Sequence, residues 1–290
     1  MGSFSILNNI SGLNAQNQLN INNVNLARTL QRLSSGKRIN TGADDAAGLQ
    51  IADSLKANTQ ALDQAVRNAN DGIGVSQIAD GALQQITNLL TRGVTLAEEA
   101  ATGTVDSAGR TSLNNEFGQI EAEIARIAQQ TNYNGVGIFT TGAGNLAGTL
   151  SVFVGDITQG SSISVTISSI TFDATAHTVS NVGGADLTTV DLATSQTTAA
   201  NALAVLKTAL NGVAGMRASI GAGINRLQSA VAVLQTQSQN TAAAESGIRD
   251  ANIAAEVANL TKFQILAQTG MAALAQANTS SQAVLNLLRG

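Results

Sequence analysis

The sequence predicts a mainly α-helical protein, a long antiparallel helical bundle or coiled coil built from both termini, with a small β-hairpin region in the middle of the chain. Three observations support this fold class. Apolar side chains recur every three or four residues over long stretches, as on the buried stripe of a helix. Both ends of the chain lack charged side chains over long runs. One short central segment alternates apolar and polar residues, which is typical of strands.

The composition narrows the class of protein further. Of 290 residues, 43% are hydrophobic but only 2% are aromatic, so the core must be built mainly from Leu, Ile, Val and Ala. The chain has no Cys, which excludes disulfides and thiolate chemistry. A net charge of -4 with dispersed basic residues predicts no nucleic-acid binding. No run of 18 apolar residues occurs, so we expect no membrane insertion.

The N-terminal segment is the first predicted helix. Residues 1–27 contain no Asp, Glu, Lys or Arg but carry eight Asn. An exposed helix normally keeps charges on its wet face, whereas a helix surrounded by other helices must avoid them because burying charge is costly. We therefore predict a buried assembly seam that includes two leucines of this segment, Leu19 and Leu26, and two that follow it, Leu30 and Leu33.

Three charged, amphipathic helices are predicted next along the chain. The first runs from Asp44 to Ala100, although glycines such as Gly72 and Gly74 weaken it and allow a break near there. The second spans about residues 108–130 and ends before the Tyr-Asn-Gly at 133–135. The third spans about 199–244 and should pack against the other two.

Between the second and third of these helices, the apolar period changes to two. Leu150, Val152 and Val154 alternate with small or polar residues, and Ile163, Val165 and Ile167 do the same. The segment between them is rich in Gly and Ser and can turn. This pattern predicts a β-hairpin over about residues 148–173.

The C-terminal segment, like the N-terminal segment, has a long run without charged side chains. Residues 263–288 contain no charged side chain. Alternating steps of four and three residues from Ile253 follow a sustained repeat of 3.5 residues, which predicts that this helix packs along its whole length against a partner helix. A single Asn in such a repeat can fix the register of the two helices. The predicted seam on this stride comprises Ile253, Val257, Leu260, Met271, Leu274, Asn278, Leu285 and Leu288.

The sequence offers little catalytic chemistry. His177 is the only His, so one chain contains no two-His metal site and no Cys–His pair. Asp44 and Asp45 are adjacent and precede a predicted helix, which favours capping over acid–base catalysis. The Gly-rich residues 142–148 lack dinucleotide-binding spacing and precede a strand. We expect neither an enzyme nor a bound metal or cofactor.

Several segments together resemble the bacterial flagellins. LQRLSSGKRINTGADDAAGLQIADSLKANTQAL, residues 30–62, is similar to the N-terminal flagellin signature, which ANDGIGVSQIADGALQQITNLL continues over 69–90. The resemblance covers QTNYNGVGIF at 130–139, resumes with RASIGAGINRLQSAV at 217–231, and extends through residues 245–288. Matches at both ends in the same order are far more specific than one short motif.

The resemblance implies a self-polymerising structural subunit of a hollow flagellar filament used for swimming. It implies that residues 1–43 and 250–290 form inner-tube helices, that 44–249 form an outer helical domain, and that no large outermost domain is inserted. It further implies extracellular localisation, type III export without a cleaved signal peptide, an export chaperone on the C-terminal segment, and contacts with the filament cap and hook-junction proteins.

The resemblance also implies a site for receptor recognition, and two other classes of protein remain as alternatives to a filament subunit. An animal innate immune receptor recognises many flagellins through an Arg, a Leu and a Glu, and these fall at Arg92, Leu96 and Glu116. The nearest alternative is a hook-filament junction protein, which shares flagellin-like terminal helices. A membrane-active amphipathic protein is a second alternative, which the scarcity of Lys and Arg on the terminal helices disfavours.

Overall fold

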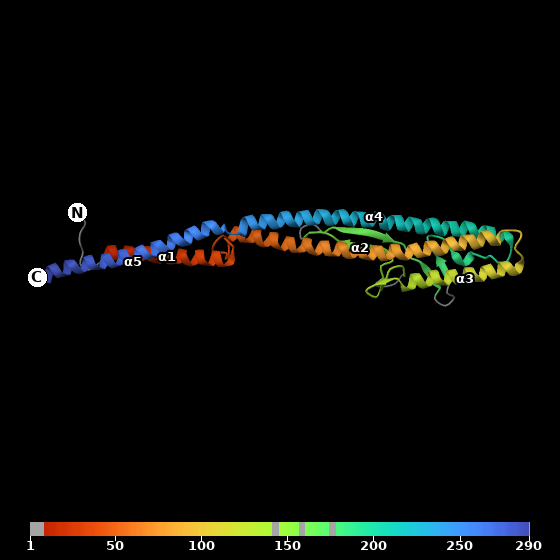
Figure 1. Ribbon diagram of the computed structural model, residues 1–290, viewed down its shortest axis with the longest axis horizontal. Helices are drawn as coiled ribbons and strands as arrows, with labels where there is room; N and C mark the ends of the chain where they lie inside the picture. Colours follow the sequence, from red (N-terminus) through yellow and green to blue (C-terminus); the bar gives the residue numbers. More distant parts are fainter. Residues whose placement is uncertain (1–8, 141–144, 157–159, 174–177, 290) are drawn as a thin grey trace. The chain divides into compact units, whose positions relative to one another are not determined.

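The structure of the 290-residue chain is a computed structural model, and Figure 1 shows its elements. It describes residues 9–140, 145–156, 160–173 and 178–289; for 172, 173, 178 and 280–289 it describes the backbone alone. Within these residues five α-helices dominate: α1 (Ile10–Ser35), α2 (Ala46–Ala100), α3 (Ser107–Gln130), α4 (Gln196–Arg249) and α5 (Ile253–Arg289). The predicted mainly α-helical fold class is confirmed.

The chain divides into two compact units. Met1–Ala57 and Asn240–Gly290 form one, here called the terminal unit, and Asn58–Gln239 form the other, here called the central unit.

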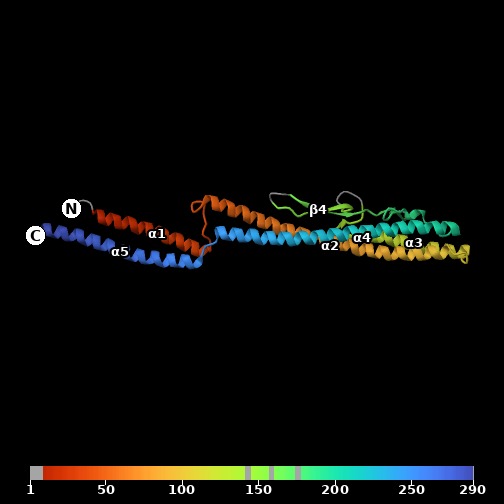
Figure 2. The same ribbon diagram turned by 90° about the horizontal axis from the view of Figure 1, so that it is seen from above.

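In the terminal unit, α1 and α5 lie side by side, as both views of the ribbon show (Figures 1 and 2). Contacts that join Asn9 to Asn278 at one end and Arg32 to Glu256 at the other make the two helices antiparallel. Asn9 caps the start of α1 by accepting a hydrogen bond from the Gly12 amide at 2.9 Å. Gly36 ends α1 in the left-handed conformation, with φ of 71°, which a glycine adopts without strain.

In the central unit, α2 contacts both α3 and α4. An ion pair of 2.8 Å joins Asp80 of α2 to Arg217 of α4. On the other side, Gly93 of α2 faces the ring of Phe117 in α3. The α2 helix is continuous through Gly72 and Gly74, so the break that their low helix propensity allows does not occur.

The described strands form three antiparallel pairs. β3 (Gly148–Phe153) pairs with β4 (Ser162–Ile167), which confirms the predicted hairpin. Two other pairs were not predicted: β1 (Asn132–Tyr133) with β2 (Val136–Gly137), and β5 (Thr171–Asp173) with β6 (Thr178–Asn181). The β1–β2 connection is a two-residue turn with positive φ at Asn134 and Gly135, as Asn-Gly favours.

One hydrophobic core runs through the central unit. It combines the inner faces of α2, α3 and α4 with the inner faces of the strands, and the 3₁₀ turn η1 (Leu187–Thr189) closes it. Its largest fully buried side chains are aliphatic apart from Phe139. The core is therefore built mainly from Leu, Ile, Val and Ala, as the composition predicts.

Candidate assembly surface

The terminal helices pair along a regular seven-residue repeat. On α1, the buried and half-buried positions include a series spaced alternately by three and four residues: Gly12, Ala15, Leu19, Asn22, Leu26, Thr29 and Leu33. A repeat of this spacing keeps one face of a helix against its partner along the whole contact.

The facing repeat on α5 is equally regular. Between residues 253 and 279, every side chain that is not exposed lies on one 4-3 stride: Glu256, Leu260, Phe263, Ala267, Gly270, Leu274 and Ala277. We call this stride and its counterpart on α1 the terminal seam. Gly270 faces Leu19 across the seam, where an added Cβ would lie 3.4 Å from Leu19 Cδ1. Asn9 closes the far end by donating to the Ala277 carbonyl at 3.2 Å.

The seam ends on a charged group that the sequence analysis missed. Arg32 lies 3.6 Å from the Glu256 carboxylate and 3.9 Å from that of Asp44. Glu256 is only 9% exposed, and Arg32 is the cation beside it. A half-buried pair at one end of an otherwise uncharged seam fixes which residues of α1 and α5 can face each other.

The two turns of the terminal unit are also bonded to each other. The Arg38 amide donates to the Arg249 carbonyl at 2.7 Å, and the Ala251 amide donates to the Gly36 carbonyl at 2.9 Å. The Arg38 guanidinium adds a bond of 2.6 Å to the Ile248 carbonyl. These contacts tie the turn after α1 to the turn before α5.

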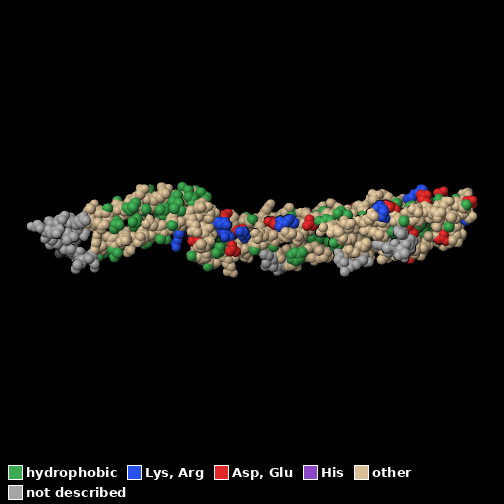
Figure 3. All heavy atoms as spheres, turned by 90° about the horizontal axis from the view of Figure 1, so that it is seen from below, with side chains coloured by type: hydrophobic (Ala, Val, Ile, Leu, Met, Phe, Trp, Pro, Cys, Tyr) green, Lys and Arg blue, Asp and Glu red, His purple; other side chains and the backbone are tan. Residues whose placement is uncertain are grey.

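Away from the seam, the terminal helices expose large apolar side chains. Figure 3 shows apolar side chains gathered over these helices, where charged ones are sparse. The set, here called the exposed stripe, is 37–61% exposed: Ile10, Leu13, Ile21, Val24, Leu30, Ile253, Val257, Ile265, Leu266 and Met271. Large apolar side chains exposed in this number, on helices with so few charges, mark an interaction site.

The predicted seam residues divide between these two surfaces. Five lie half-buried on the terminal seam: Leu19, Leu26, Leu33, Leu260 and Leu274. Four lie on the exposed stripe: Leu30, Ile253, Val257 and Met271. Asn278 is exposed and accepts from the Asn9 amide group at 3.4 Å. The side chains of Leu285 and Leu288, like residue His177, lie outside the described part of the chain.

The three residues of the predicted receptor site lie in different environments. Arg92 of α2 donates to Glu116 of α3 through Nε at 2.9 Å and Nη2 at 2.7 Å, and both side chains are about half exposed. Leu96, by contrast, has no exposed surface and belongs to the core. Of these three residues, only Arg92 and Glu116 expose their side chains at the surface.

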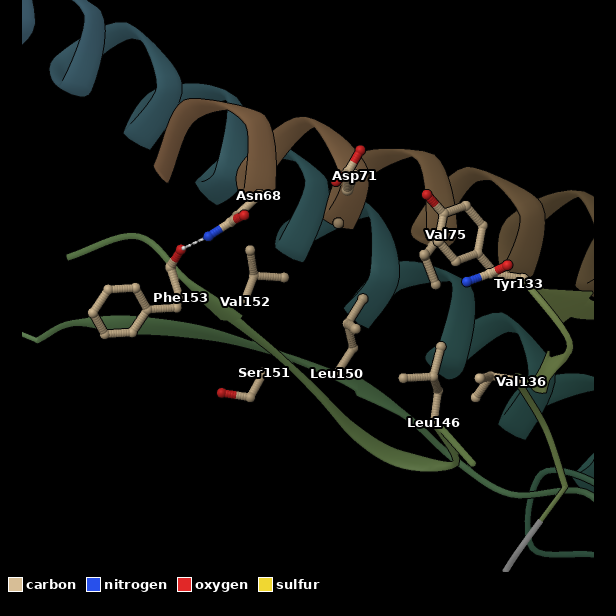
Figure 4. Close-up of a pocket in the computed structure, with 12 residues that line it drawn as sticks. Asn68, Asp71, Val75, Tyr133, Val136, Leu146, Leu150, Ser151, Val152 and Phe153 are labelled. Carbon is tan, nitrogen blue, oxygen red and sulfur yellow. Dashed lines mark hydrogen bonds between the residues drawn. The ribbon is translucent and has the colours of Figure 1, made fainter. Parts of the chain in front are cut away.

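A cavity of about 480 Å³ lies between α2 and the β3–β4 hairpin (Figure 4). Its walls include Val75, Leu150 and Val152, and Tyr133 lies at its edge. Asn68 of α2 donates to the Phe153 carbonyl at 3.2 Å and so joins the helix to the hairpin. Among the described residues, no group of His, Asp or Glu has the arrangement of a metal site. None of the helices searched in that same part is long and apolar enough to cross a membrane.

These observations define a helical structural protein whose terminal helices pair along a nearly uncharged seam and expose an apolar stripe. Residues 6–142 match the model of the bacterial flagellin N-terminal helical region, and residues 203–288 match that of the bacterial flagellin C-terminal helical region. The chain is 34% identical to flagellin FlaB1 of Treponema pallidum and 36% identical to a flagellin of Halalkalibacterium halodurans, in each case over 98% of this chain and 99% of the relative.

A crystal structure of Bacillus cereus flagellin has a TM-score of 0.46 and 26% identity to this chain, covering 62% of this chain and 94% of that one. On the family models and the relatives, the chain belongs to the bacterial flagellin family. It is a structural subunit of the flagellar filament, an extracellular appendage in which copies of the subunit assemble. Nothing in the comparisons favours the hook-junction alternative.

Proposed function

We propose that the exposed stripe is the surface through which copies of this chain polymerise. The observation that carries this proposal is the combination of helices nearly free of charge with ten large, exposed apolar side chains. Burying each such side chain gains about 1.5–3 kcal/mol, so a lateral contact that covers several of them is strongly favourable. Residues 1–43 and 250–290 then form the inner tube, and 44–249 form the outer domain.

The terminal seam and the exposed stripe have different tasks in this proposal. The seam, with Leu19, Leu26, Leu33, Leu260 and Leu274, holds the two ends of one chain together. The stripe, with Leu30, Ile253, Val257 and Met271, contacts neighbouring subunits. The export chaperone binds the C-terminal segment before assembly, and the filament cap and hook-junction proteins bind the assembled ends. The chain has no catalytic role in this proposal.

Seeded polymerisation tests the stripe. Val257→Asn and Ile265→Asn place a polar side chain on the stripe without touching the seam, and Gln268→Asn is a matched control at an exposed polar position of α5. We expect the first two variants to stay folded by circular dichroism but to fail to elongate seeds, whereas the control elongates normally. Normal filaments from both stripe variants would contradict the proposal.

Truncation gives an independent test of the C-terminal helix. Removing residues 271–290 leaves the central unit and the charged end of the seam intact. We expect a folded monomer that does not polymerise on seeds viewed by electron microscopy. Long uniform filaments from the truncated chain would show that the last turns of α5 are dispensable for assembly.

A second function is recognition by an animal innate immune receptor. The observation that favours it is the exposed Arg92–Glu116 pair, which presents one cation and one anion from adjacent helices on the surface. Leu96 supports this surface from the core rather than contacting a partner. A reporter-cell assay with monomer tests the site, and no response at high dose would reject it.

A further inference from the structure

Residues 178–192 form a strap that lies along α3. It comprises β6, a tight turn, η1 and the residues up to Leu192, and β6 packs directly on α3. Its apolar anchors Val179, Val182 and Leu187 have no exposed surface. The turn is closed by paired backbone bonds between Val182 and Ala185 of 2.9 and 3.0 Å. The strap is therefore an ordered, separate layer over the helices.

Two side chains of α3 hold the strap by accepting hydrogen bonds from its backbone amides. Near one end, Asn114 Oδ1 accepts from the Leu192 amide at 3.0 Å. Near the other end, Glu121 Oε1 accepts from the Val179 amide at 2.8 Å. The two bonds are alike in geometry, but one acceptor is a neutral amide and the other is ionisable.

Glu121 is an unusual acceptor because it is only 7% exposed. Burial raises the pKa of its carboxyl, the Val179 hydrogen bond opposes that rise, and the charge of Asp186, in the strap itself, adds to it. Among the described residues that influence this carboxyl, Asp186 is the charged one, and no cation pairs with Glu121. A buried carboxylate without a cation is costly to keep ionised.

We propose that Glu121 is an acid-reinforced latch: when its carboxyl is protonated the strap docks more tightly on α3, and when it ionises the strap loosens. The direction follows from linkage. A group whose pKa is raised by folding stabilises the folded state fully below its unfolded pKa, and this contribution disappears as the pH rises through the folded pKa. The protonated carboxyl still accepts from the Val179 amide through its carbonyl oxygen, so the latch keeps its bond while it loses its charge.

Hydrogen exchange of single amides, corrected for the intrinsic effect of pH, tests the latch in the full chain. We expect protection of the Val179 amide to rise on acidification from about pH 7 to about pH 4.5, by up to about tenfold for each unit by which folding raises the pKa. The Leu192 amide is the internal control, because its neutral acceptor Asn114 does not titrate in this range.

Two variants make the result decisive. In Glu121→Gln the acceptor oxygen remains but the charge is gone, so Val179 protection should be high and independent of pH. His177 is the only histidine in the sequence, so the series is repeated with His177→Gln, which should leave the wild-type pH dependence intact. Equal pH dependence in wild type and Glu121→Gln would overturn the proposal, as would protection that falls on acidification.

Discussion

Val152 of the β3–β4 hairpin occupies the space beside Gly72 of α2. A Cβ added at Gly72 would lie 2.6 Å from Val152 Cγ2. A second contact of the same kind joins Val165 of the hairpin to Gly223 of α4, at 2.7 Å. The hairpin therefore docks by inserting one valine into a notch on each of the two long helices, and glycine provides each notch because it has no side chain.

Gly72→Ala should destabilise the chain relative to Gly74→Ala. Both changes gain the same helix propensity, about 1 kcal/mol, but only position 72 overpacks the hairpin. Gly74 has open space where its Cβ would be. We expect the two variants to differ by about 1–3 kcal/mol in the free energy of unfolding, measured by urea denaturation. Equal stability would show that the hairpin shifts without cost.

A tighter contact joins Gly212 of α4 to Gly183 of the strap. A Cβ at position 212 would lie 1.9 Å from the Gly183 carbonyl oxygen, which is backbone and has no alternative rotamer. We expect Gly212→Ala to reach or exceed the upper end of the usual overpacking cost of about 1–3 kcal/mol. Gly215→Ala, one turn away in open space, should be neutral or stabilising in the same denaturation experiment. Matching stabilities for the two variants would contradict the close contact.

The sequence predicts the helices and the main hairpin well because their signal is local. The 3.6-residue apolar period marks α2 and α3 to within two residues, and the two-residue period marks the β3–β4 pair, although the predicted hairpin extends six residues beyond the end of β4. The glycine notches cannot be predicted from neighbouring residues in the sequence. In α2 alone, Gly72 only lowers the helix propensity; its role in packing depends on Val152, 80 residues away. The strands β5 and β6 are missed for a different reason: each has too few residues to show an alternating pattern.

The register of the seam is harder to predict than its existence. The predicted stride on α5 and the terminal seam share Leu260, Ala267 and Leu274, and the seam's other positions include Glu256 and Gly270. Those two residues do not count as apolar, so a search for apolar positions favours the neighbouring stride through Val257 and Met271. An almost uncharged helix has no polar face that would separate the two choices. Only the pairing with α1 does so.

Asp44 gives the terminal unit a dependence on acid. Its carboxylate accepts from the amides of Thr41 and Asn40 and from the Thr41 hydroxyl. These bonds, led by the Thr41 amide and assisted by the charge of Arg32, lower the pKa of Asp44. A group whose pKa is lowered by folding stabilises the folded state above its unfolded pKa, and that stability is lost as the pH falls through the folded pKa.

We therefore expect Asp44→Asn to be less stable than wild type near neutral pH and to approach wild type below about pH 4. The measurement is the free energy of unfolding of both chains between about pH 7 and about pH 2. A difference that stays constant over the whole range would mean that the charge of Asp44 contributes nothing to the turn at residues 40–44.

A variant of the Arg92–Glu116 pair should lose receptor recognition without losing stability. Both side chains are exposed, so Glu116→Gln should change the free energy of unfolding by less than about 1 kcal/mol. The same variant should abolish the response of receptor reporter cells to monomer. Glu123→Gln is a matched control, because Glu123 forms an equally exposed pair with Arg126 on the same helix and should leave the response unchanged.

Leu96→Ala belongs in the same experiment for a different reason. Its side chain is fully buried in the core, so its truncation should cost about 2–5 kcal/mol, whether or not a receptor recognises the chain. A lost response in this variant counts as recognition only when circular dichroism and urea denaturation show that the chain is folded under the conditions of the assay. If Leu96→Ala is folded and silent while Glu116→Gln remains fully active, the exposed pair is not the recognition site.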